Sequence, residues 1–102
     1  MKKFKALYHA MNDDLKDAEM MIDYACEIRD EDKDIADELA KYAEYRLEHF
    51  MEFHKIFQEE AMKAKVNTET METCLWHETH EMMQDWYYST ERKINKYKNK
   101  EG

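Results

Sequence analysis

The segment RDEDKD, residues 29–34, decides the fold, because it lies between two long stretches with helical periodicity. On both sides of it, apolar residues recur at three- and four-residue steps, as on one face of an α-helix. Acidic side chains are favoured at the start of a helix, and Asp30 or Asp32 can cap a new one. We therefore predict that the chain turns here and that the two helices form an antiparallel hairpin.

One alternative stays open, because the seven-residue phase continues through this segment. Most of the positions at every seventh residue from Tyr8 to Ala64 are apolar or small. A single continuous helix in a dimeric coiled coil would give the same pattern. In that arrangement, however, Arg29, Asp32 and Lys33 would bring charges to the seam, so the hairpin is the favoured prediction.

The whole chain is predicted to be one all-α domain, an up-down-up bundle of three long helices. Its 102 residues contain no proline, and the only glycine is the last residue. These are the residues that break helices and build tight turns. The predicted helices span about 3–29, 33–65 and 69–97, with a second turn at Val66-Asn67-Thr68. Helices of about 40–50 Å are long for so small a core, so we expect self-association, most simply a homodimer.

Two polar residues fall on the apolar face of the second helix, whose flanks carry Ile35, Tyr42, Phe53 and Ile56. Arg46 lies near the middle of that face, and a buried charge needs a partner. By its level in the bundle, we predict a partly buried ion pair of Arg46 with Asp14, Glu19 or Asp85. His54, on the same face, is expected to be a core histidine with its hydrogen bonds satisfied.

A metal site is weighed at Cys74, His77 and Glu81, which share one face of the third helix. Zinc takes such ligands, but a set from one helix that mostly faces away from the core is not a favoured site. We therefore expect no native metal there and no cofactor. The chain also contains no glycine-rich phosphate loop, CxxC pair or HExxH helix, so an enzyme is not the favoured class.

Residues 17–57, DAEMMIDYACEIRDEDKDIADELAKYAEYRLEHFMEFHKIF, resemble the helical hairpin of ferritin-like proteins, rubrerythrin-type in particular. The resemblance implies a related helical packing; in that family Glu-x-x-His motifs help to hold a di-iron centre. This chain contains no Glu-x-x-His, since Arg46 stands three residues before His49 and Lys55 three residues after Glu52. The second hypothesis is therefore an atypical ferritin-like metal protein. Its candidate ligands are Glu19, Glu52, His49, His54, His77 and His80.

Charge and hydropathy limit the classes of partner. The net charge is −8, and residues 12–60 hold 17 acidic residues against 6 basic ones. This acidic body would repel nucleic-acid phosphates, although an acidic regulator that mimics nucleic acid is a third hypothesis.

No apolar run approaches the roughly 18 residues of a membrane span. Two cysteines at opposite ends of the bundle predict reduced thiols and a cytoplasmic location.

The leading hypothesis is a non-enzymatic helical interaction or scaffold protein. We expect it to self-associate and to present an acidic, aromatic-edged surface to a protein partner. Aromatic and methionine side chains concentrate in interface cores, although the same residues can equally form internal core. The predicted contact residues are Trp76, Met83, Trp86, Tyr87 and Tyr88.

Overall fold

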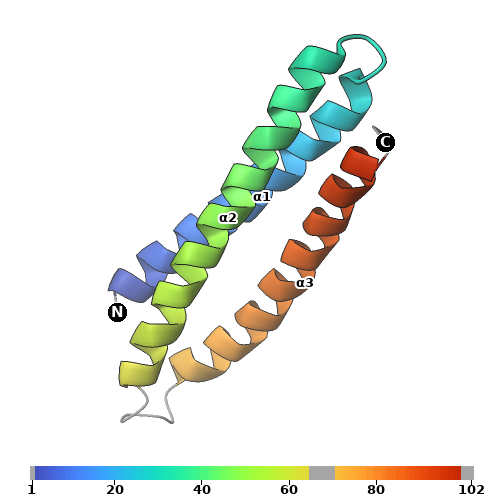
Figure 1. Ribbon diagram of the computed structural model, residues 1–102. Helices are drawn as coiled ribbons and strands as arrows, with labels where there is room; N and C mark the ends of the chain where they lie inside the picture. The colour runs from blue at the N-terminus through green and yellow to red at the C-terminus, as the bar shows by residue number, and fades with distance from the viewer. Residues whose placement is uncertain (1, 65–70, 100–102) are drawn as a thin grey trace.

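The computed structural model describes residues 2–64 and 71–99, and the side chains of 2–63 and 81–99. It contains three helices, α1 (Lys2–Ile28), α2 (Lys33–Ala64) and α3 (Met71–Asn99). They run up, down and up along a rod of 53 × 19 × 17 Å (Figure 1). The predicted all-α three-helix bundle is confirmed, and each helix begins and ends within two residues of its predicted bounds. The predicted turn at 66–68 lies outside the described residues.

The turn between α1 and α2 rules out the continuous helix. Backbone N–H groups of Glu31 and Asp32 donate to the carbonyl oxygen of Ile28, at 2.9 and 2.8 Å, and close the end of α1. The Asp32 carboxylate then accepts the N–H of Ile35 at 3.1 Å, as an N-cap does. Of the two predicted caps, Asp32 is therefore the one used. No described residue has a positive φ, so this turn is made without glycine.

Alanine occupies many of the buried positions of the α1–α2 hairpin near this turn. Small side chains allow two helices to approach closely, whereas larger ones fill the interior towards the other end. The hairpin is therefore a tightly packed unit with a continuous apolar interior. Its buried apolar residues are Met11, Leu15, Ala18, Ile22 and Ala25 from α1, and Ala36, Ala40, Ala43, Leu47, Phe50 and Phe57 from α2.

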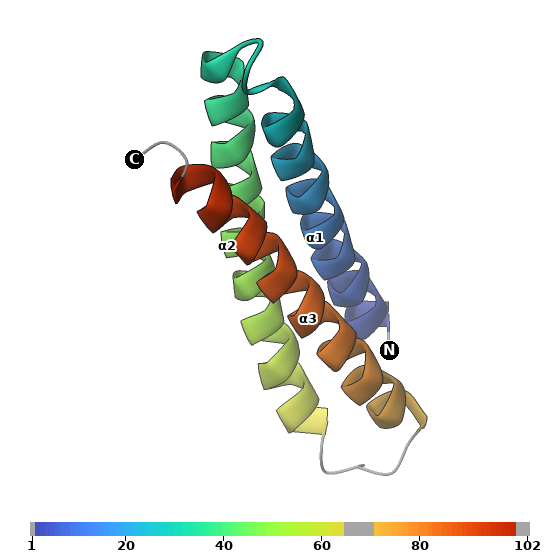
Figure 2. The same cartoon turned by 90° about the vertical axis from the view of Figure 1, so that its right-hand side faces the viewer.

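Helix α3 lies against one side of the hairpin (Figure 2). Trp86 Nε1 donates to the Glu19 carboxylate on α1 at 3.0 Å. The Tyr97 hydroxyl donates to Asp37 on α2 at 2.6 Å. These two bonds, with the buried side chains between them, fix α3 to both helices. The buried residues of α3 are Met83, Thr90, Ile94 and Tyr97.

Two further features of the described chain are the hydropathy of its helices and the positions of its two cysteines. None of the described helices has an apolar stretch long enough to cross a membrane. Cys26 is a free thiol near the end of α1, and Cys74 lies in the first turns of α3. Those two parts of the chain are at opposite ends of the bundle (Figure 1), which agrees with the prediction that the cysteines do not pair.

Candidate interaction surface

Asp14 is the centre of a buried polar cluster between α1 and α2. Its carboxylate accepts a bond from Arg46 Nη2 at 2.9 Å and lies 3.0 Å from His49 Nδ1. Arg46 also reaches Asp17, at 3.0 Å. The ion pair expected for Arg46 is therefore present, with one of the three predicted acids and with a second acid that the sequence analysis missed. Helical spacing does indicate Asp17, because it lies about one helical turn from Asp14 on the same side of α1.

The other two predicted partners of Arg46 lie elsewhere. Glu19 accepts the Trp86 N–H and lies 3.8 Å from Lys93 Nζ, on the side of α1 that faces α3. Asp85 is exposed on α3. Glu19 lies five positions after Asp14, and at 100° per residue this turns Glu19 to a different side of the helix. The prediction that named Glu19 and Asp85 beside Asp14 was too broad.

The ion pairs distinguish two sides of the hairpin. On one side, Asp23 and Glu44 pair with Lys93 and Lys98 of α3. On the other side, Asp17 pairs with Arg46, and α3 makes no recorded hydrogen bond or ion pair among the described residues there. Residues 4, 7 and 11 positions after Asp17, and residues 4, 7 and 11 positions before Arg46, share this second side of the hairpin. They are Met21, Tyr24, Ile28, Ile35, Leu39 and Tyr42, and we call them the open face.

The open face carries large apolar side chains in contact with water. Tyr24, Ile35 and Tyr42 are 47%, 53% and 42% exposed. Met21, Ile28 and Leu39 are half-buried and pack against the core beneath them. A single exposed apolar residue is ordinary, whereas a contiguous group on two neighbouring helices is typical of an interaction site. The Arg46 guanidinium lies over the Tyr42 ring, 5.9 Å from the ring centroid.

Exposed carboxylates surround the end of the open face nearest the turn. Asp34 lies in the first turn of α2, where negative charge is favourable. Glu27 and Asp30 instead lie at the carboxyl end of α1, where the helix dipole disfavours negative charge. Their position therefore does not stabilise the hairpin. We use the name acidic rim for five exposed residues near the turn: Glu27, Asp30, Glu31, Asp34 and Glu38.

The contact residues predicted on α3 are mostly internal. Met83 is buried, so of the two roles that the sequence leaves open for it, interface contact or internal core, it has the internal one. Trp86 and Tyr87 are half-buried against the core, and the Tyr87 ring stacks on Phe50 at 5.5 Å between centroids. Burial, with the nearby Glu91 carboxylate as the next cause, raises the pKa of Tyr87. Among the predicted contacts whose side chains are described, Tyr88 alone is exposed; the Trp76 side chain lies outside the described ones.

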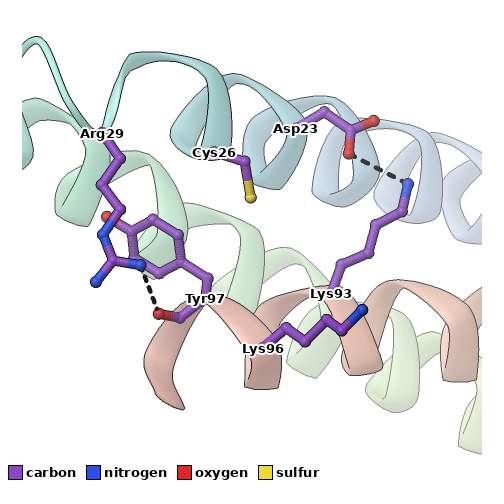
Figure 3. Close-up of a pocket in the computed structure, with 6 residues that line it drawn as sticks. All are labelled: Asp23, Cys26, Arg29, Lys93, Lys96 and Tyr97. Carbon is purple, nitrogen blue, oxygen red and sulfur yellow. Dashed lines mark hydrogen bonds and ion pairs between the residues drawn. The ribbon is translucent and has the colours of Figure 1, made fainter. Parts of the chain in front are cut away.

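A cavity of about 270 Å³ lies between α1 and α3 near their carboxyl ends (Figure 3). Arg29 stacks over the Tyr97 ring, 4.6 Å from its centroid, and Nη1 donates to the Tyr97 carbonyl oxygen at 3.0 Å. Lys93 pairs with Asp23 at 3.2 Å. Cationic side chains at this end compensate the negative ends of two helix dipoles. The charges around the cavity therefore already have a structural role. Its lining residues are Asp23, Cys26, Arg29, Lys93, Lys96 and Tyr97.

The candidate metal ligands do not come together in the described part of the chain. The side chains of Cys74 and His77 lie outside it, and Glu81 is exposed. Among the described residues, no three His, Cys, Asp or Glu side chains are grouped as a metal site would require. The ferritin-type candidates are dispersed or undescribed: Glu19 faces α3, His49 contacts Asp14, His54 is buried, Glu52 is exposed, and the side chains of His77 and His80 lie outside the described ones.

No family model, curated protein or solved structure matches this chain.

Proposed function

We propose that the protein is a non-enzymatic helical interaction module and that the open face is where it docks a protein partner. One observation carries this proposal. By helical spacing, Tyr24, Ile35 and Tyr42 share one side of the hairpin, away from the residues that bond to α3, and each is about half exposed. When a partner removes an apolar face of this kind from water, the free energy falls, which favours binding.

Burial of the open face supplies part of the free energy of binding. Full burial of a large apolar side chain is worth about 1.5–3 kcal/mol, so completing the burial of three half-exposed ones contributes roughly 3 kcal/mol. The helices beneath the open face are already packed, so little backbone conformational entropy remains to be lost there on binding.

This surface is acidic and aromatic-edged, as the sequence suggested, but it consists of other residues. The earlier candidates belong to α3 and are largely used to fix α3 to the hairpin. The open face uses the flanks of the apolar stripes of α1 and α2 instead. Among the described residues, no comparable surface or site supports the hypotheses of a ferritin-like metal protein or of an acidic nucleic-acid mimic.

The predicted homodimer is compatible with the proposal but is not the occupant that we favour for this face. A two-fold dimer places the same patch of each copy against the other. Where the two hairpins met in parallel, this would also bring two acidic rims together, and like charges oppose association. A different protein does not meet this obstacle.

Site-specific photo-crosslinking in the cells that make the protein tests the proposal. A photoreactive phenylalanine analogue replaces Tyr42 on the open face or, as the control, the exposed Met82 on α3. We expect a discrete cross-linked product from position 42, and none from position 82. Adding Ile35→Lys should abolish the product while leaving the circular dichroism unchanged. Equal products from both positions, or none from position 42, would contradict the proposal. A product of twice the chain's 12.5 kDa would identify a second copy as the partner.

A further inference from the structure

We infer that the partner segment that occupies the open face is a short amphipathic helix with basic flanks. This inference rests on the proposed function and adds the chemistry of the partner. It depends on three features of the hairpin: the shape of the open face, the charge of its rim, and the way in which α3 already binds the opposite side.

The shape favours a helix. The open face is made by two antiparallel helices that lie side by side (Figure 1), and each of them contributes apolar residues to it. A helix that lays its apolar stripe along such a pair buries residues at steps of three and four. From Met21 to Ile28 the face extends about 12 Å along α1, so a partner helix of two to three turns covers it.

The charge favours a basic partner. Residues 27–38 contain seven acidic and two basic residues. Both bases are used on the α3 side: Arg29 contacts Tyr97, and Lys33 pairs with Asp37, which accepts the Tyr97 hydroxyl. Within the described residues, the carboxylates of Glu27, Asp30 and Asp34 have no recorded ion-pair partner. Lysine or arginine flanks on a docked helix would supply one.

Helix α3 provides an example of this binding mode within the same molecule. Its apolar residues pack on the hairpin, while Lys93 pairs with Asp23 of α1 and Lys98 pairs with Glu44 of α2. From Thr90 to Asn99, α3 carries four basic residues and one acidic residue. The hairpin thus already binds one amphipathic helix with basic flanks, and the open face presents the same combination of apolar centre and acidic edge on its other side.

Two synthetic peptides test the inference with the full chain. Each has 18 residues and the same leucine stripe at helical spacing, but one carries lysine and arginine on its flanks and the other glutamate. Binding is measured by fluorescence anisotropy. We expect the basic peptide to bind at least tenfold more tightly than the acidic one. This preference should shrink in 1 M salt, where the screening length falls from about 10 Å at 0.1 M to about 3 Å.

Charge-reversal variants locate the effect. Glu27→Lys with Glu38→Lys should weaken binding of the basic peptide about tenfold. The matched control, Glu48→Lys with Glu59→Lys, changes two exposed carboxylates of α2 outside the open face and should leave binding within twofold. Thermal unfolding of each variant checks that the fold is retained.

The outcomes separate the two proposals. Equal binding of both peptides, or equal weakening by both double variants, overturns the basic helix and leaves the interaction module standing. Failure of both peptides to bind, together with a cross-linked product at position 42, also overturns the basic helix alone. Failure of both peptides without any such product overturns the interaction module as well.

Discussion

Asp14 and Arg46 meet at 2.9 Å across the α1–α2 interface, on the side of the hairpin that α3 leaves uncovered. Asp14 is buried. Arg46 also pairs with Asp17, and its guanidinium lies near the ring of Tyr42. The pair therefore helps to set the register of the hairpin, and Arg46 lies beside Tyr42 at one edge of the open face. Its loss should be felt in stability and in binding together.

Arg46→Leu should lower the free energy of unfolding by about 2–3 kcal/mol, because it leaves the enclosed Asp14 carboxylate without its cation. Urea unfolding followed by circular dichroism measures this change. Lys41→Leu is the control, since Lys41 and Glu38 form an exposed pair that is worth little. An Arg46→Leu protein as stable as the parent would show that the pair does not hold the hairpin together.

Asp32→Ala should destabilise the protein by about 1 kcal/mol, because the Asp32 carboxylate caps the first turn of α2. Asp30→Ala, two residues earlier, removes an exposed carboxylate without a capping bond and should change the unfolding midpoint little. Equal losses in the two variants would contradict the assignment of the cap.

Two adjacent methionines test the packing of α3. Met83 is 4% exposed and Met82 is 72% exposed. Met83→Ala should therefore cost about 2–4 kcal/mol through lost burial and a residual cavity, whereas Met82→Ala should stay within about 0.5 kcal/mol. Chemical unfolding of both variants in parallel gives the comparison. The reverse order would mean that α3 turns another side towards the hairpin.

The raised pKa of Tyr87 predicts a loss of stability in alkali. The folded protein holds the phenol proton more tightly than the unfolded chain, so the stabilising effect is complete below the ordinary value of 10.0 and is lost as the pH rises through the folded pKa. Stability measured from pH 9 to pH 11 should fall less steeply in Tyr87→Phe than in the parent protein. Parallel curves would contradict the assignment.

Much of the fold followed from local patterns. Periodicity and the absence of internal glycine and proline predicted three helices, the acidic run at 29–34 predicted the first turn, and Arg46 on an apolar stripe predicted a nearby acid. Each of these depends on residues within a few turns of one another, or on a charge that must be compensated.

The open face could not be predicted in the same way. Ile35 and Tyr42 lie at the flank of the stripe of α2, and whether a flank is covered depends on which side of the hairpin α3 packs. Helical periodicity does not determine on which side α3 packs. Tertiary contacts do, such as those of Trp86 with Glu19 and of Tyr97 with Asp37. The wide apolar arc of α3 was ambiguous for the same reason: its residues fit an interface or the core equally well, and Met83 lies in the core.

The most direct test of the open face is a map of backbone amide chemical shifts in the isotope-labelled chain, recorded with and without the basic peptide. The account predicts perturbed amides at residues 21–28 and 35–42, and unperturbed ones at residues 81–99 of α3. Perturbations concentrated on α3, or spread evenly along the three helices, would contradict it.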